Sequence, residues 1–245
     1  MIMFVIIILV ASVLQTSTGF GFSIMATPFL LLLFHPHEAI QINIILSLLI
    51  SVLLVWNMKE DIDLILLKRF IAGSIVGVPF GLFIFLQLDI AAFQFIVSIL
   101  LLLLTLLLIL RLRIRATSTR DFFVGGLSGL LTTSIGMPGP PLLLYFAGTG
   151  SNKRRIRATT LAFYLFIYLI SLITQMTFAG TNQTIWMSSL YAIPIVVVGL
   201  FLGQLMFKLL NQRLFRIITF ILLSCTGFYL LYESFVVFGW ISACR

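Results

Sequence analysis

Ten apolar stretches, separated by short polar or basic connectors, make up almost the whole chain. Six of them approach the roughly 20 residues that an α-helix needs to cross the hydrocarbon core of a bilayer. These six predicted spans are 38–57, 70–87, 90–110, 158–178, 186–207 and 214–232. The other four stretches are shorter and form two adjacent pairs, 2–34 and 122–149. The pattern predicts an all-α, polytopic membrane protein.

Small, polar and helix-breaking residues interrupt each short pair at its middle. The first interruption contains Gly19 and Gly21, and the second contains Gly136, Pro138 and Gly139. Proline lacks the N–H that a helix needs, and glycine adopts backbone conformations that other residues resist. Each pair is therefore predicted to be a re-entrant hairpin or two short tilted helices. In both cases the chain returns to the side from which it entered.

The two halves of the chain look like copies of one unit. Each has a broken pair followed by three long segments, and the sequence at Gly77–Gly81 resembles that at Gly199–Gly203. Because each unit has an odd number of segments, the second must be inverted relative to the first, as in many secondary transporters. The predicted domains are a first repeat at 1–112, a cytoplasmic connector at 113–120 and a second repeat at 121–245.

The composition supports a membrane environment. The chain is 61% hydrophobic and 9% charged, whereas soluble domains carry about 25% charged residues. The net charge of +8 could indicate nucleic-acid binding, but the basic residues lie in alternate connectors, as the positive-inside rule predicts, so no nucleic-acid partner is expected. All basic residues except Arg245 fall in the clusters Lys59–Arg69, Arg111–Arg120, Lys153–Arg157 and Lys208–Arg216. The basic loops are thus predicted to be cytoplasmic and both termini to lie outside.

The two breaks are the candidate binding site. A helix that starts after a break directs unpaired N–H groups and its positive dipole end towards the break, which suits a small anion. The expected substrate-binding residues are Thr18, Gly19, Gly21, Ser23, Thr27, Thr133, Ser134, Gly136 and Gly139. Further polar contributors are expected at Gln15, Asn43, Asn57, Tyr164 and Gln175. The alternative, in which small residues only allow close helix packing and hydroxyls bond their own backbone, stays open.

Fixed charge is expected to be absent from the membrane centre, so dipoles and hydroxyls alone would hold the anion. Arg157 and Arg216 are predicted at a cytoplasmic entrance, where they would attract anions. No nucleophile–base arrangement, nucleotide-binding loop or metal-ligand pattern is apparent, so we expect no enzyme activity, cofactor or metal site. Two other classes of function are a membrane-embedded enzyme and a non-transporting scaffold. An enzyme would need titratable groups that converge at membrane depth, and in a scaffold the breaks would only pack against other helices.

Two elements of this sequence resemble the sulfite exporter TauE/SafE family of bacterial membrane proteins. One is Gly19-Phe20-Gly21-Phe22-Ser23 with Pro28, and the other is Gly125-Gly126-Leu127-Ser128-Gly129 with Gly136-Met137-Pro138-Gly139. The resemblance covers nearly the whole length. Phe22 and Ser23 stand where family members often have glycine, and Pro138, Pro140 and Pro141 make the second element unusually rich in proline. The resemblance implies transport of sulfite, organosulfonates or related small anions.

These observations predict a secondary transporter that exports sulfite or an organosulfonate across the bacterial inner membrane. An anion leaves a negatively charged cytoplasm downhill, by about 2.3 kcal/mol per charge per 100 mV, so export needs no coupling ion. An importer or a channel for another small anion on the same fold is the alternative. The expected partners are the anionic substrate and the lipid bilayer, and a homodimer is the assembly to test.

Overall fold

The computed structural model describes residues 2–87, 117–149 and 152–209, with isolated residues between 95 and 106 and between 224 and 236. Every regular element in the described part is helical, which confirms the all-α prediction. The predicted spans 90–110 and 214–232 lie almost entirely outside the described residues.

The helices follow the apolar segments closely. The first half contains α1 (Ile2–Thr18), α2 (Phe22–Leu30), α3 (Pro36–Val55), the 3-10 helix η1 (Trp56–Asp61) and α4 (Leu64–Gln87). The second half contains α6 (Ser118–Ile135), α7 (Gly139–Thr149), α8 (Lys153–Ala179) and α9 (Gln183–Leu209). Four helices of the described part are long and apolar enough to cross a membrane: α3 with η1, α4, α8 and α9. They correspond to four of the six predicted spans.

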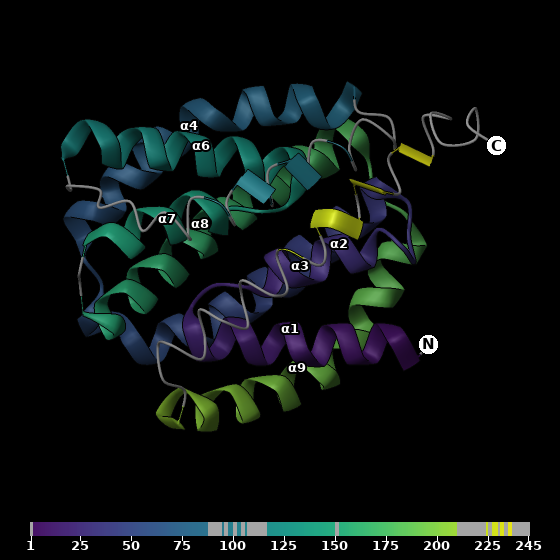
Figure 1. The fold of residues 1–245 in the computed structure, drawn as a ribbon, viewed down its shortest axis with the longest axis horizontal. Helices are drawn as coiled ribbons and strands as arrows, with labels where there is room; N and C mark the ends of the chain where they lie inside the picture. The colour runs from purple at the N-terminus through teal and green to yellow at the C-terminus, as the bar shows by residue number, and fades with distance from the viewer. Residues whose placement is uncertain are drawn as a thin grey trace.

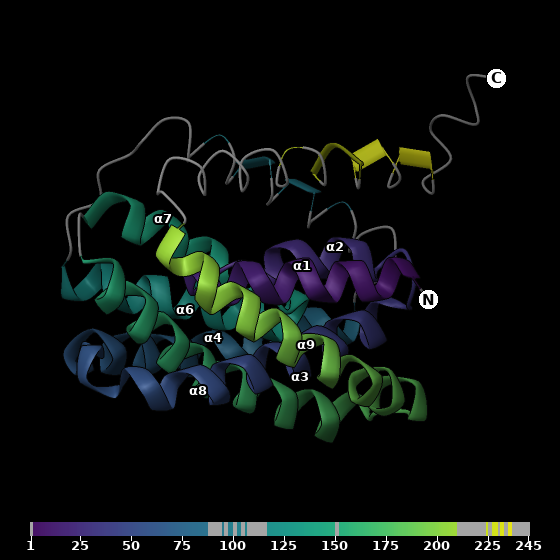
Figure 2. The ribbon, with the colours of Figure 1, turned by 90° about the horizontal axis from the view of Figure 1, so that it is seen from below.

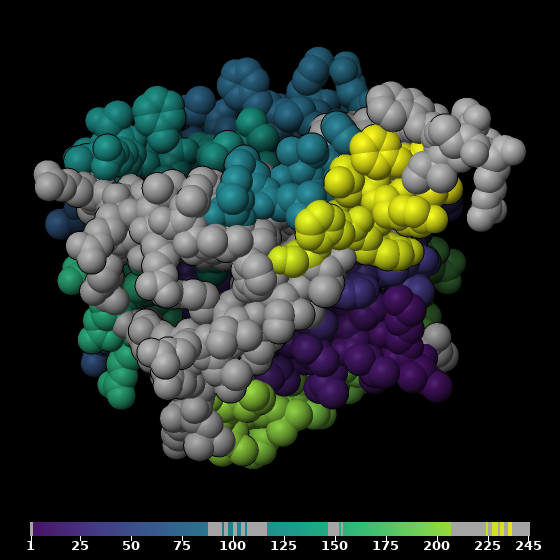
Figure 3. All heavy atoms as spheres, viewed as in Figure 1, coloured from purple at the N-terminus to yellow at the C-terminus, as the bar shows by residue number. Residues whose placement is uncertain are grey.

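Two helix pairs form opposite edges of the molecule. Helix α4 packs along α6, and α9 packs along α1. Helices α3 and α8 contact each other; they lie between these pairs in Figure 1 and along one face of the bundle in Figure 2. The space-filling view places α4 and α6 at one edge and α1 and α9 at the other (Figures 1, 2 and 3). Each edge therefore joins an element of the first half to an element of the second half.

Glycines bring α4 and α6 into backbone contact. A Cβ atom on Gly77 would overlap the carbonyl oxygen of Gly126, and one on Gly81 would overlap that of Leu130. Only a residue without a side chain permits this approach. The pair resembles the small-residue interfaces of membrane helices, where close backbone packing replaces the hydrophobic driving force.

The same arrangement recurs between α9 and α1. A Cβ atom on Gly199 would lie 3.3 Å from the carbonyl oxygen of Leu9, and one on Gly203 would lie 2.8 Å from that of Val13. Leu9 and Val13 are separated from Gly126 and Leu130 by the same number of residues. The carbonyls of Gly126 and Leu130 are the ones that the α4 glycines contact. This correspondence supports the predicted relationship between the halves.

The outward faces of the edge helices are apolar. Phe80 on α4 is 63% exposed and Phe201 on α9 is 73% exposed. A soluble protein rarely exposes a continuous apolar surface of this kind. The lipid phase is therefore the environment that these faces fit.

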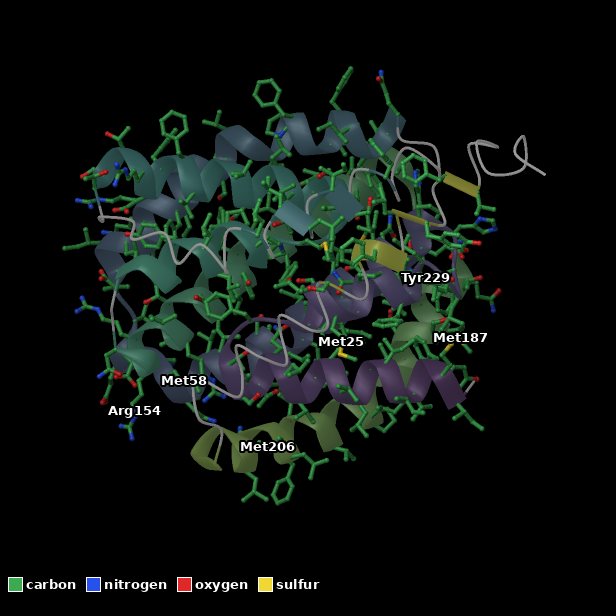
Figure 4. The ribbon with its side chains drawn as sticks, in the orientation of Figure 1. Met25, Met58, Arg154, Met187, Met206 and Tyr229 are labelled. Atoms are coloured by element: carbon green, nitrogen blue, oxygen red, sulfur yellow. The ribbon has the colours of Figure 1, made fainter. Side chains whose placement is uncertain are left out.

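Arg154 and η1, which contains Lys59, mark a basic end of the bundle. Arg154 points away from the ribbon at the end that also holds Met58 of η1, whereas Met187 of α9 lies at the opposite end (Figure 4). We predicted that residues 153–157 form a connector before the helix. Instead, α8 begins at Lys153, because the side chain of Asn152 caps the helix by accepting a hydrogen bond from the N–H of Arg154 at 3.1 Å.

Candidate functional site

The first break lies between α1 and α2. Gly19 (φ 83°) and Gly21 (φ 113°) both occupy the left-handed region that favours glycine. A side chain on Gly19 would also meet the Cγ of Arg157 at 2.9 Å. The Thr18 hydroxyl contacts the Leu14 carbonyl at 2.6 Å and accepts the N–H of Phe20 at 3.0 Å. Thr18 thus closes the end of α1, as the alternative interpretation of the hydroxyls expects.

The second break lies between α6 and α7. Gly136 is left-handed (φ 73°), and its N–H donates to the carbonyl of Thr132 at 2.8 Å. The next residue, Met137, donates to the carbonyl of Leu131 at 3.1 Å, which completes the helix end. The side-chain amide of Asn43 on α3 donates to the carbonyl of Gly136 at 2.8 Å. Asn43, a predicted polar contributor, therefore holds the second break in place.

The two breaks meet beside α8. A side chain on Gly139, the first residue of α7, would contact the Tyr164 hydroxyl at 3.0 Å and the Cδ1 of Ile24 on α2 at 3.1 Å. One turn further along α8, the hydroxyl of Tyr168 donates to the Oγ of Ser23 at 3.2 Å. The structure thus brings together the predicted residues Ser23, Gly139 and Tyr164. Tyr168 was not predicted, although its spacing of one helical turn from Tyr164 places both on one face of α8.

Several polar atoms near the breaks are buried without a hydrogen-bond partner among the described residues. An unpaired buried polar atom costs about 1–3 kcal/mol, so a concentration of them indicates a functional position. These atoms are Gln15 Oε1, Thr16 Oγ1, Thr27 Oγ1, Asn43 Oδ1, Thr160 Oγ1, Tyr164 Oη and Gln175 Oε1. They come from the helices on either side of the first break, α1 and α2, and from the two central helices, α3 and α8.

Other predicted residues connect helices to one another. The Thr133 hydroxyl lies 2.7 Å from that of Ser171, and the Thr133 carbonyl accepts from the Gln175 amide at 2.8 Å. The Ser134 hydroxyl donates to the carbonyl of Leu130 within its own helix at 2.8 Å. These bonds tie α6 to α8 and leave fewer free hydroxyls at the second break than the sequence suggested.

The remaining predicted contributors have different positions. The Gln15 amide contacts the Ser47 carbonyl at 3.5 Å and so connects α1 with α3. Asn57 is exposed in η1, at the end of α3, and is not part of the cluster around the breaks. Arg216, the second residue assigned to the cytoplasmic entrance, lies outside the described residues.

Arg157, which the sequence analysis assigned to the cytoplasmic entrance, is only 4% exposed. A side chain on Gly19 would lie 3.0 Å from its Cα, so this part of α8 packs directly on the first break. Because α8 begins at Lys153, Arg157 belongs to this helix and not to the connector before it. A buried arginine therefore accompanies the first break, and its role at an entrance stays a prediction.

Asp121 is buried as well. It lies in the first turn of α6 and is 2% exposed. It accepts hydrogen bonds from Arg69 of α4 at 2.9 Å and from the hydroxyl of Tyr145 on α7 at 2.6 Å. This carboxylate is therefore paired and joins three helices. Across the described ranges, no group of three His, Cys, Asp or Glu residues could hold a metal ion.

Comparison with known proteins gives one match. The model of the family described as "Sulfite exporter TauE/SafE" matches residues 4–230. No curated protein and no solved structure matches the chain. Since the match extends over nearly the whole length, both breaks and all the described helices except the start of α1 fall within it. The chain therefore belongs to the sulfite exporter TauE/SafE family of membrane transporters.

Proposed function

We propose that this protein exports a small anion, sulfite or an organosulfonate, from the cytoplasm through a central site at the two helix breaks. The observation that carries the proposal is the meeting of both breaks beside the buried tyrosines of α8, with Arg157 packed on the first break. Interrupted helices that meet inside a bundle are typical of substrate sites in secondary transporters.

The charges near the site favour an anion. Arg157 is buried beside the first break. The nearest buried carboxylate of the described part, Asp121, is already paired with Arg69. A site for a cation would instead need an available carboxylate, because a cation in a low-dielectric interior requires a nearby negative charge.

The direction follows from the membrane potential. The positive-inside rule favours a cytoplasmic position for the basic end of the bundle. We propose that the protein lies in the inner membrane with both termini outside. An anion moving outward gains about 2.3 kcal/mol per charge per 100 mV. Export therefore needs no second substrate, whereas import would require a coupling ion.

Alternating access would move units that combine both halves. The α4 glycines pack on the backbone of α6, and the α9 glycines pack on the Cβ atoms of Ser12 and Thr16 of α1. Neither sequence half can therefore rotate without disturbing these interfaces. The pairs α4–α6 and α1–α9 are therefore the expected rigid units. The expected hinges are the two breaks, one after α1 and one after α6.

Efflux from proteoliposomes tests this function. Vesicles containing the purified chain would be loaded with sulfite and given an inside-negative potential, with protein-free vesicles as the control. Saturable efflux that increases with potential would support an exporter. Flux that does not saturate would indicate a channel, and flux that requires a cation gradient would indicate a coupled importer. If sulfite does not move, the same vesicles should be loaded with organosulfonates and carboxylates.

A further inference from the structure

The two breaks have the same order of elements. In each, a helix ends at a left-handed glycine, Gly19 or Gly136, and two further residues lead into the next helix. The shift in numbering that relates these glycines also relates Phe22, the first residue of α2, to Gly139, the first residue of α7. The breaks can therefore be compared residue by residue.

The backbone donors at the two breaks differ. The first N–H groups of a helix have no partner within the helix, and no side chain caps α2, whose N-cap residue is Gly21. Helix α2 therefore offers the N–H groups of Phe22, Ser23 and Ile24. The residues of α7 that correspond to Ser23 and Ile24 are Pro140 and Pro141, which have no N–H. The second break thus lacks two of the three donors.

The side chains packed on the two glycines also favour an anion at the first break. A side chain on Gly19 would contact Arg157 of α8 at 2.9 Å. A side chain on Gly136 would meet the Nδ2 of Asn43 at 2.9 Å, which already donates to the Gly136 carbonyl, and the Cγ2 of Ile40 on α3 at 3.3 Å. The same shift in numbering relates Ile40 to Arg157. A cation therefore lies beside the first break where the second break has an apolar side chain.

Buried hydroxyls complete the first break. Ser23 accepts a hydrogen bond from Tyr168 at 3.2 Å, so its own O–H proton can donate to a ligand. Tyr164 is 1% exposed, and its hydroxyl, which has no partner within the described residues, lies beside Gly139, where the start of α7 meets Ile24 of α2. One turn further along α2, the fully buried Oγ1 of Thr27 is equally unpaired in this part of the chain.

We infer that the anion binds at the first break, and that the second break, which has fewer backbone donors, supplies mainly shape and hinge motion. The N–H groups at the start of α2 and the Ser23 hydroxyl would bind the oxygens, and Arg157 would supply the balancing charge. The helix end is equivalent to about half a positive charge. Together with one arginine it balances an anion of one negative charge better than an anion of two. The expected ligand is therefore a singly charged oxyanion, such as the headgroup of a sulfonate. This inference rests on the proposed function.

Variants at corresponding positions of the two breaks test the inference. Ser23→Pro removes an N–H and a hydroxyl at a position where the equivalent residue, Pro140, shows that proline fits the helix start. It should raise the half-saturating sulfite concentration about tenfold or more, and Ser23→Ala, which keeps the N–H, about threefold. Arg157→Gln should raise it about tenfold, with partial recovery in Arg157→Lys. The matched controls Pro140→Ala and Pro141→Ala, which restore an N–H, should stay within about twofold.

A second measurement separates binding from transport. Ligand that binds the folded protein raises its melting temperature, so purified protein would be heated with methanesulfonate, sulfite or sulfate. Stabilisation of the parent protein by methanesulfonate more than by sulfate, weakened in Ser23→Ala and in Arg157→Lys, would support the inference even if Ser23→Pro does not fold. If this stabilisation is present but no saturable efflux is found, the transport proposal fails and the site stands.

Three results would overturn the inference. The first is a change in half-saturating concentration in Pro140→Ala or Pro141→Ala as large as that in Ser23→Pro. The second is unchanged binding in Ser23→Ala and Arg157→Gln together. The third is the absence of stabilisation by every one of the three anions in protein that is folded and monodisperse.

Discussion

Replacing Gly77 with alanine should force α4 away from α6. The new Cβ would overlap the carbonyl oxygen of Gly126 and lie 2.8 Å from the backbone nitrogen of Leu130. Ordinary contacts between heavy atoms are about 3.5–4.0 Å long, so α4 must retreat by at least about 0.7 Å. Because both neighbours are backbone atoms, they cannot rotate away. The whole interface must open instead.

The expected loss of stability follows from two opposing effects. Overpacking of a tight interface costs about 1–3 kcal/mol, and alanine returns up to about 1 kcal/mol through its higher helix propensity. A net loss of about 1–2 kcal/mol would lower the melting temperature of a chain of this size by roughly 3–8 °C. The measurement is thermal unfolding of the purified protein in detergent, followed by tryptophan fluorescence.

Gly126→Ala is the matched control in the same interface. Its Cβ would approach only the carbonyl oxygen of Gly73, at 3.3 Å, a contact that a small adjustment can relieve. The melting temperature of this variant should stay within about 2 °C of the parent protein. If the melting temperature of Gly77→Ala equals that of the parent, or if both variants lower it equally, the backbone-contact explanation is wrong.

Two further predictions concern the framework of the site. Asp121→Asn should lower the free energy of unfolding by about 1–3 kcal/mol, because it weakens a buried ion pair and a tyrosine hydrogen bond. Asp63→Asn should lower the free energy of unfolding by less than about 1 kcal/mol, since its arginine partner is 61% exposed. Equal losses of this free energy in chemical denaturation would argue against a difference between the buried and the exposed ion pair. Gly81→Ala and Gly203→Ala should lower the melting temperature by similar amounts, because each new Cβ would meet a carbonyl and a threonine at corresponding positions. A loss in only one of them would count against the equivalence of the two edges.

Local chemistry in the sequence determined where the helices lie and where two of them break. The apolar segments predicted α3, α4, α8 and α9 to within a few residues, because each helix satisfies its own backbone hydrogen bonds and its length follows from its apolar residues. The breaks at Gly19 and Gly136 were predicted for the same reason, since backbone freedom is a property of the residue itself.

Only the tertiary structure decided which polar groups converge. Arg157 packs on Gly19 although the two residues are far apart in the chain, whereas the Asn152 cap that starts α8 is a local signal in the sequence. The bond from Tyr168 to Ser23 joins residues far apart in the chain, and Asn57 fell outside the cluster because η1 carries it to the surface. The pairing of α4 with α6 and of α9 with α1 depends on shapes that fit across space, which no local pattern of residues encodes.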